Sequence, residues 1–189
     1  YKRQDVSKAS SLDASDRKVL GSSMPTWYGG WNNTVSYKNF DLNVFFRFSG
    51  GNKIMNASRQ SALFNMDFSN NGTEILGRWI SPEQPGDGMT PKIGYGDASS
   101  LFNDGYTDSH FVESGNYLKL STLALGYTLP KAVVSKLNMT KIRFYVQGQN
   151  LLTITGYSGL DPETNSRLGV DWNGMPQQRS FTFGANITF

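Results

Sequence analysis

The chain has 189 residues with a formal net charge of +3 at pH 7, a mean hydropathy of −0.43 and an aromatic content of 13%. The absence of any run of about 18 apolar residues excludes a transmembrane helix, and the small, dispersed charge gives no reason to expect nucleic acid as a partner. The chain contains no cysteine, which excludes disulfides and thiolate metal sites.

The first two predicted strands form a tight hairpin. One runs from about Gly30 to Lys38 and the other from Phe40 to Ser49, with only Lys38 and Asn39 between them. In the second strand, apolar and polar residues alternate, which is typical of a strand with one apolar face. The apolar set is Phe40, Leu42, Val44, Phe46 and Phe48, and the opposite set is Asp41, Asn43, Phe45 and Arg47.

A third predicted strand, Tyr117 to Leu129, changes phase along its length. Its apolar residues switch parity between Leu120 and Leu123. One extra residue reverses the alternation of a strand, so a β-bulge near Ser121 and Thr122 would bring all the apolar side chains to one face.

Two more strands complete the pattern, Lys141 to Leu151 and the last ten residues from Ser180. Both alternate apolar and polar side chains. Between the third and fourth strands, Pro130 is followed by a possible helical turn, Lys131 to Leu137.

The connections alternate between short and very long. Residues 50–116, which include a helix-compatible stretch around Ile54 to Phe64, and residues 153–178 form the two long connections. Outer-membrane β-barrels have short periplasmic turns and long extracellular loops. If Phe189 ends in the periplasm, both short connections fall on the periplasmic side and both long ones outside. The sequence therefore predicts an all-β fold, an antiparallel transmembrane β-barrel of which residues 1–189 supply the last five strands.

The final residues have the pattern of an outer-membrane assembly signal. A polar residue is followed two positions later by glycine, with apolar residues at the antepenultimate and final positions. These are Thr182, Gly184, Ile187 and Phe189. The alternative interpretation is an ordinary amphipathic edge strand.

Longer strings resemble the SusC/RagA family of TonB-linked outer-membrane transporters. Gly115 to Pro130 is similar to the family's "SYLRLKNLTLGYTLP" segment, and Ile142 to Leu151 to "LRVYVSGQNLFTFT". Tyr157 to Glu163 resembles "YKGYDPE", and Gly77 to Trp79 begins a stretch similar to "RWTPEN". Together with Asp16 to Gly21, these strings follow the family's order over nearly the whole chain.

The resemblance implies a barrel of about 22 strands with a plugged lumen, in the outer membrane of a Gram-negative bacterium. It also implies import of glycans or peptides, powered by the TonB complex and assisted by a SusD-like surface lipoprotein. Because the chain starts at Tyr1 without a leader, the plug and the TonB box are expected before that residue. Outer-membrane lipids are the surrounding partner, and no cofactor is implied.

Seven strand residues are predicted to face the lumen. Charges on the lipid face would cost about 2–4 kcal/mol at the midplane. Inside the barrel they can pair with carboxylates of the plug, which is the favoured role, or line the substrate path. The seven are Asp41, Asn43, Arg47, Lys119, Arg143, Tyr145 and Gln147.

Substrate-contacting residues in the loops are less specific. Trp79, Tyr157 and Trp172 could stack on sugar rings or peptides, or could pack the loops. Asp161, Glu163 and Asn165 alternate as calcium ligands do, but a turn that begins with Asp-Pro is far commoner, and no metal is predicted there or in residues 11–16.

Two other functions remain open. A passive porin would share the barrel but lack the plug. A soluble carbohydrate-binding β-sandwich would also be rich in aromatic residues, but its strands would be regularly spaced with modest loops. An enzyme is not expected, because the residues give no convincing catalytic constellation and His110 is the single histidine.

Overall fold

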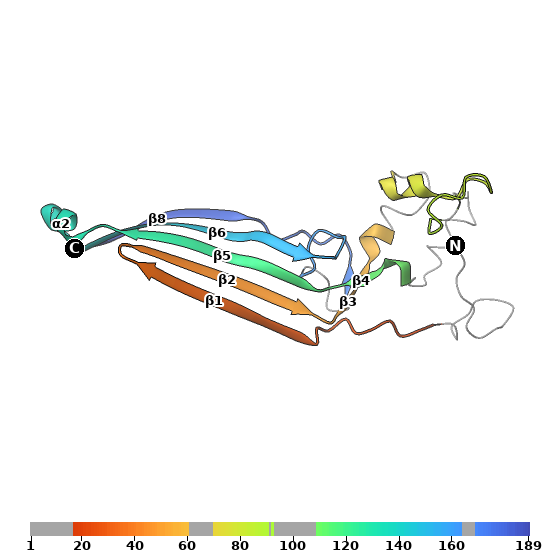
Figure 1. Ribbon diagram of the computed structural model, residues 1–189, viewed down its shortest axis with the longest axis horizontal. Coiled ribbons are helices and arrows are strands. Elements are labelled where there is room, and N and C mark those ends of the chain that lie inside the picture. Colours follow the sequence, from red (N-terminus) through yellow and green to blue (C-terminus); the bar gives the residue numbers. More distant parts are fainter. Residues whose placement is uncertain (1–16, 61–69, 91, 93–108, 164–168) are drawn as a thin grey trace.

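Five long strands form one antiparallel sheet (Figure 1). The computed structural model describes residues 17–60, 70–90, 92, 109–163 and 169–189. The strands lie in the order β1-β2-β5-β6-β8, and each is antiparallel to its neighbours. They are β1 (Trp27–Tyr37), β2 (Phe40–Gly50), β5 (Tyr117–Thr128), β6 (Lys141–Thr155) and β8 (Ser180–Thr188). All five predicted strands are confirmed. β6 continues to Thr155, so the last connection begins three residues later than predicted.

The short connections lie together at one end of this sheet, beside the C-terminus (Figure 1). Lys38 adopts a left-handed conformation, with φ 53°, in the two-residue turn between β1 and β2. The β5–β6 connection contains α2 (Lys131–Val134) and a 3₁₀ turn, η5 (Ser135–Leu137), as the sequence indicates. Asn138 ends this turn in the left-handed region, where asparagine is one of the residues that are tolerated.

A second, three-stranded sheet lies at the opposite end and is built from both long connections. β3 (Lys53–Asn56) pairs antiparallel with β4 (Val112–Ser114) and parallel with β7 (Val170–Asp171). No strand was predicted in these connections, because strands of two to four residues are too short to show alternation. Ile54 and Phe111 are fully buried in this region, and Met55 and Ile75 pack against Phe111. The first long connection also contains two short 3₁₀ turns, η3 (Thr73–Gly77) and η4 (Ser109–Phe111).

The predicted helix around Ile54 to Phe64 is only partly correct. Ile54 lies in β3, and helical turns begin at Ala57 and continue to Gln60. The amide nitrogen of Arg59 donates a hydrogen bond to the Asn56 side chain at 2.9 Å, as at a helix start. Residues 61–64 lie outside the described part of the chain. Among the described residues, no helix is both long and apolar enough to cross a membrane.

The predicted β-bulge is present. Phe45 pairs with Thr122 and Phe46 with Leu120, so Ser121 is the extra residue of β5. On the other side of β5, two residues of β6, Asn150 and Leu151, lie opposite Ser121, and Asn150 adopts φ 53°. The bulge keeps the apolar residues of β5 in line with those of β2 along its full length.

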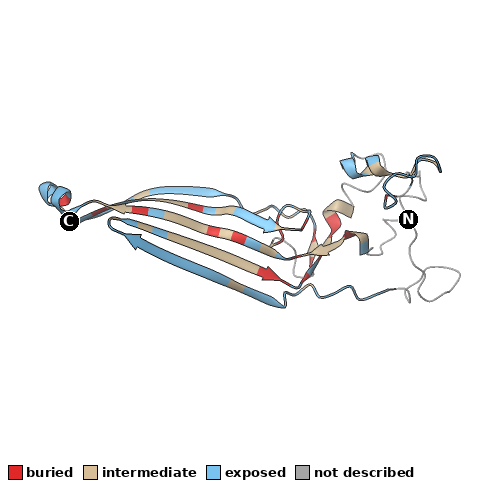
Figure 2. Ribbon diagram, viewed as in Figure 1, coloured by how far each residue is buried: buried red, intermediate tan, exposed pale blue. Residues whose placement is uncertain are grey.

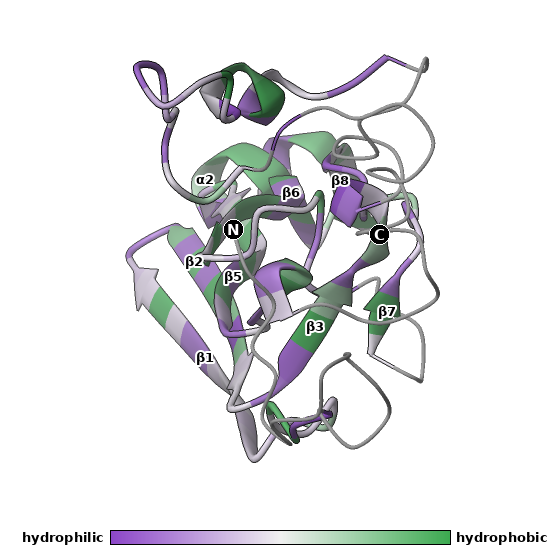
Figure 3. Cartoon of the chain, turned by 90° about the vertical axis from the view of Figure 1, so that its right-hand side faces the viewer, coloured by the Kyte–Doolittle hydropathy of each residue, from purple (hydrophilic) through white to green (hydrophobic). Residues whose placement is uncertain are grey.

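The register gives the sheet one apolar and one polar face. Cross-strand partners such as Leu42, Leu125 and Val146 share the apolar face, and Figure 3 shows the alternation as stripes along β1 and β2. Many apolar side chains are exposed, including Phe183 at 79% and Trp31 at 56%. Figure 2 shows that β1 and β8, the two edge strands, are exposed over most of their length. A sheet with an exposed apolar face and two edges is a part of a larger assembly.

Candidate functional site

The seven residues predicted to face the lumen do share one face of the sheet. Asn43, Ala124, Gln147 and Thr182 form one continuous cross-strand row from β2 to β8. Arg47 lies opposite Lys119, and the row through Gly126 contains Asp41 and Tyr145. That this polar face lines a lumen stays a prediction.

An ion pair crosses the polar face near the turn end. The Arg143 Nε donates to Asp41 Oδ1 at 2.9 Å, and its Nη2 to Oδ2 at 2.5 Å, although β5 runs between the two strands. Gly126 makes this possible, because a Cβ at that position would lie 2.5 Å from Asp41 Oδ1. Arg143 was predicted to pair with a plug carboxylate, whereas in this structure its partner is Asp41 on β2, two strands away in the same sheet.

A buried ionic cluster lies at the opposite end of the polar face. We define the ionic cluster as Lys119, Arg47, Asp161, Glu163 and Tyr117. The Lys119 side chain is 1% exposed, and its Nζ lies 3.1 Å from Asp161 Oδ2 and also contacts Glu163. Arg47 Nη2 lies 3.1 Å from Glu163 Oε2, and the Tyr117 hydroxyl donates to Glu163 Oε1 at 2.7 Å.

The ionic cluster fixes the β6–β8 connection onto the sheet. Asp161 Oδ1 accepts a hydrogen bond from the Glu163 amide at 3.0 Å, and Asp161 Oδ2 accepts one from the Gln177 amide at 3.3 Å. One carboxylate therefore neutralises Lys119 and joins both limbs of the connection. Arg47 and Lys119 pair with this connection in the structure, whereas their predicted partners were carboxylates of the plug.

Asp161 and Glu163 are held by protein cations, which is a different use from the calcium ligands that their spacing allows. No group of three or more metal-binding side chains occurs among the described residues. Asn165, the third member of that pattern, and residues 11–16 lie outside the described ranges. The register of the strands brings the cations to this carboxylate pair, and the spacing of the acidic residues alone does not reveal it.

Hydrogen bonds also join the two long connections to each other. The Ser158 amide donates to Glu113 Oε2 at 2.7 Å, and the Ser158 hydroxyl donates to Glu113 Oε1 at 2.7 Å. Within the β6–β8 connection itself, the Tyr157 hydroxyl donates to Asp171 Oδ2 at 2.5 Å. Burial, followed by this hydrogen bond and the Asp171 charge, raises the pKa of Tyr157.

The three aromatic candidates have different surroundings. Tyr157 is 5% exposed and packs inside the loop region, which favours the packing alternative for this residue. Trp79 is half-buried, with Lys92 Nζ 5.9 Å from its ring centroid. Trp172 is 70% exposed, so its ring is the most available of the three for a ligand.

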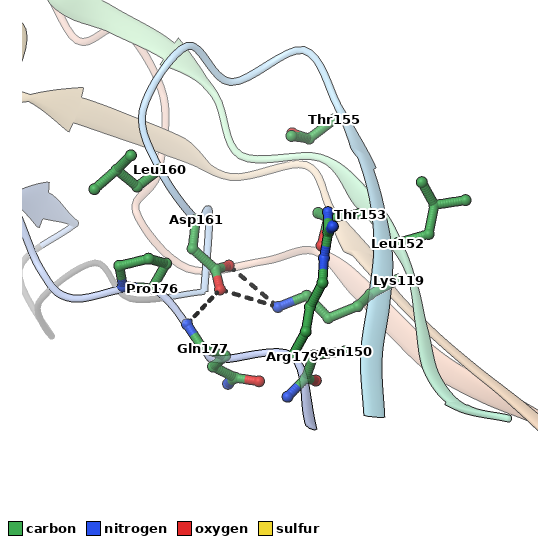
Figure 4. Close-up of a pocket in the computed structure, with 10 residues that line it drawn as sticks. All are labelled: Lys119, Asn150, Leu152, Thr153, Thr155, Leu160, Asp161, Pro176, Gln177 and Arg179. Carbon is green, nitrogen blue, oxygen red and sulfur yellow. Dashed lines mark hydrogen bonds and ion pairs between the residues drawn. The ribbon is translucent and has the colours of Figure 1, made fainter. Parts of the chain in front are cut away.

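A cavity of about 310 Å³ lies between the polar face of β6 and the β6–β8 connection (Figure 4). Thr153 and Thr155 line it from the strand, and Leu160 and Pro176 line it from the connection. Arg179 extends beside Thr153 in Figure 4 and pairs with no carboxylate of the described residues. The cavity thus combines hydroxyl groups, a small apolar surface and a guanidinium group, and Arg179 was missed by the sequence analysis.

The residues of the assembly signal lie along β8. Thr182 pairs with Gln147, Gly184 with Tyr145 and Ile187 with Ile142. A Cβ on Gly184 would lie 2.6 Å from Tyr145 Cε1, so the tyrosine ring requires glycine at this position. Phe189 is 85% exposed. These contacts give Gly184 a packing role, and recognition by an assembly machinery stays a prediction.

Comparison with known proteins gives a consistent result. The chain is 32% identical over 195 residues to TonB-dependent receptor P3 of Formosa agariphila, covering 98% of this chain and 18% of that protein. It is 25% identical to the TonB-dependent receptor SusC of Bacteroides thetaiotaomicron, over 95% of this chain and 17% of that protein. A structure of the RagAB peptide importer in the 'open-open' state matches with a TM-score of 0.80 and 25% identity, over 98% of this chain and 20% of the RagAB chain. The chain thus spans about a fifth of the length of these proteins, and no family model matches it.

Proposed function

We propose, since this chain belongs to the SusC/RagA family of TonB-dependent receptors, that it forms part of the wall of an outer-membrane barrel that imports a nutrient. The observation that carries the proposal is the division of one five-stranded sheet into an apolar and a polar face, maintained across a bulge. The apolar face contacts lipid, and the polar face lines the transport path.

The orientation follows from the lengths of the connections. The turns at Lys38 and α2 face the periplasm, and the small sheet of β3, β4 and β7 faces the outside. The wall continues on both sides of this segment, because β1 and β8 each have one unpaired edge among the described strands. Backbone groups at such an edge cannot remain unpaired in lipid.

The nutrient is a peptide or a glycan, and the partners are a SusD-like lipoprotein outside and the TonB complex inside. The similarity to SusC and to the RagAB peptide importer supports these partners. Trp172 and the cavity beside Arg179 lie on the outer half of the segment. Through them the segment would contact the nutrient.

Uptake by cells that depend on the full-length transporter tests this function. Labelled peptides and oligosaccharides are supplied to cells with and without the transporter, and the proton-motive force is then collapsed. We expect transporter-dependent uptake that stops when the force is lost. Uptake that continues unchanged would identify a passive porin, and no transporter-dependent uptake of either class would reject nutrient import.

The contribution of the cavity is tested with Arg179→Gln, compared with Arg17→Gln at an exposed position outside the sheet. Uptake is divided by the amount of folded transporter in the outer membrane. A selective loss of uptake in Arg179→Gln would support ligand contact at the cavity. Equal uptake in the two variants would remove Arg179 from the transport path.

A further inference from the structure

The turn end of the sheet carries an unbalanced positive charge. Lys38 lies in the β1–β2 turn, Lys131 and Lys136 lie in the β5–β6 connection, and Lys141 begins β6. All four are exposed. Figure 1 shows the two turns and the C-terminus at the same end of the molecule. We call these four residues the lysine belt.

No side-chain carboxylate of the described residues forms an ion pair with the lysine belt. Within residues 34–43, 124–146 and 183–189, the single acidic side chain is Asp41, and both its oxygens are bound by Arg143. None of the four lysines forms an ion pair with a described residue. Lys38 Nζ lies 5.2 Å from the centroid of the Tyr37 ring.

The fold therefore concentrates a charge that is dispersed in the sequence. The turn end contains five of the 18 basic residues and one of the 15 acidic residues, a side-chain charge of +4. The rest of the chain has 13 basic and 14 acidic residues, which is a charge of −1. The whole formal excess of the chain thus lies at one end of the sheet.

Exposed apolar side chains adjoin the lysine belt. Val133 and Leu137 are 46% and 53% exposed beside Lys131 and Lys136, and Tyr37 is 68% exposed beside Lys38. Lysine chains placed next to aromatic and aliphatic groups are suited to the boundary between hydrocarbon and headgroups, because the stem lies along apolar surface while the ammonium group reaches the polar layer.

We propose that the lysine belt binds the phosphate groups of anionic phospholipids at the membrane surface on the turn side of the sheet. The inference rests on the proposed function, since it requires the apolar face to lie in a bilayer. A phosphate offers oxygen acceptors to several ammonium groups at once, and an anionic lipid has no compensating positive charge of its own. A zwitterionic lipid brings its own amine, and the belt therefore prefers the anionic headgroup.

Lipid retention by the purified full-length transporter tests the proposal. The protein is exchanged into micelles containing equal amounts of phosphatidylglycerol and phosphatidylethanolamine, and the retained lipids are identified by native mass spectrometry. The test variant is Lys131→Gln with Lys136→Gln. The matched control is Lys18→Gln with Lys92→Gln, which removes the same charge away from the turn end.

We expect the wild type to retain phosphatidylglycerol preferentially. In the test variant, the ratio of retained phosphatidylglycerol to phosphatidylethanolamine should fall about tenfold. The control variant and Lys131→Arg with Lys136→Arg should keep the wild-type ratio. An equal loss in test and control variants would overturn the proposal, because it would show a response to net charge alone. A wild type without preference at low salt would also overturn it, and this result needs no variant to fold.

The uptake assay separates this inference from the proposed function. Wild-type transporter that imports nutrient but retains both lipids equally would reject the lysine belt alone. Wild-type transporter that does not insert into a membrane would reject the proposed function, and the lipid site with it.

Discussion

Lys119 is the most buried charged side chain of the ionic cluster, which joins the β6–β8 connection to the sheet. Replacing it with methionine would leave Asp161 and Glu163 close together with only Arg47 as a cation. Removing one partner of a buried ion pair costs about 3–5 kcal/mol. We expect Lys119→Met to expose the connection to limited proteolysis in the folded transporter, whereas Lys18→Met at an exposed position should not. Equal protease resistance of the two variants would show that the ionic cluster does not hold the connection.

Gly184 provides a second test at the residue scale. The Tyr145 ring occupies the space that a side chain at Gly184 would need. We expect Gly184→Val to lower the amount of transporter assembled in the outer membrane, measured by quantitative blotting, without changing uptake per assembled molecule. Gly156→Val is the matched control, because a Cβ there would meet nothing within 4 Å. Normal abundance with lost uptake would instead assign β8 a direct role in transport.

Tyr157 should ionise only at unusually high pH. Its folded-state pKa is raised above the ordinary value of 10.0 by burial first and by Asp171 second. The neutral phenol therefore stabilises the loop region below about pH 10, and this contribution is lost as the pH rises above that value. The absorbance difference between wild type and Tyr157→Phe should show no phenolate signal at pH 10. A phenolate signal that develops near pH 10, the ordinary pKa of tyrosine, would mean that the phenol is not buried.

At the scale of the strand, the register determines which side chains would meet lipid in the proposed barrel wall. Val44 lies on the apolar face, whereas Asn43 lies on the polar face and donates hydrogen bonds to Asn32 and Thr34 at 2.8 and 2.9 Å. Arginine on the lipid side costs about 2–4 kcal/mol near the midplane. We expect Val44→Arg to reduce the folded transporter in the outer membrane much more than Asn43→Arg. Equal reductions would show that the two faces are wrongly assigned.

The strands were predictable from the sequence because a half-buried strand repeats with a period of two. The shift between Leu120 and Leu123 even revealed the bulge at Ser121, since only an inserted residue restores one apolar face. The pairing of β3 with β7 was not predictable, because Met55 meets Val170 across more than 100 residues and neither strand is long enough to show a period. The partners of Lys119 were also missed, because Asp161 reaches Lys119 only after the β6–β8 connection folds back onto the sheet.

At the scale of the whole molecule, the sheet is an incomplete wall. β1 and β8 each pair on one side only among the described strands, and large apolar side chains such as Phe183 have no cover. We expect residues 1–189 expressed alone to give no stable membrane-inserted unit, because open edges in lipid cost several kcal/mol for each unpaired group. Electrophoresis with and without heating would show this as a single unfolded band. A heat-modifiable, protease-resistant monomer would contradict the prediction.

The small sheet has a consequence for how such receptors could diversify or be redesigned. β3 and β4 come from one long connection and β7 from the other, and Glu113 on the first receives both hydrogen bonds from Ser158 on the second. A graft that replaced residues 156–179 alone would exchange β7, one of the two neighbours of β3, and would take away both hydrogen bonds from Ser158 to Glu113. The two long connections thus form one structural unit. Swaps between relatives should give a folded receptor when both connections are exchanged together and fail when either is exchanged alone.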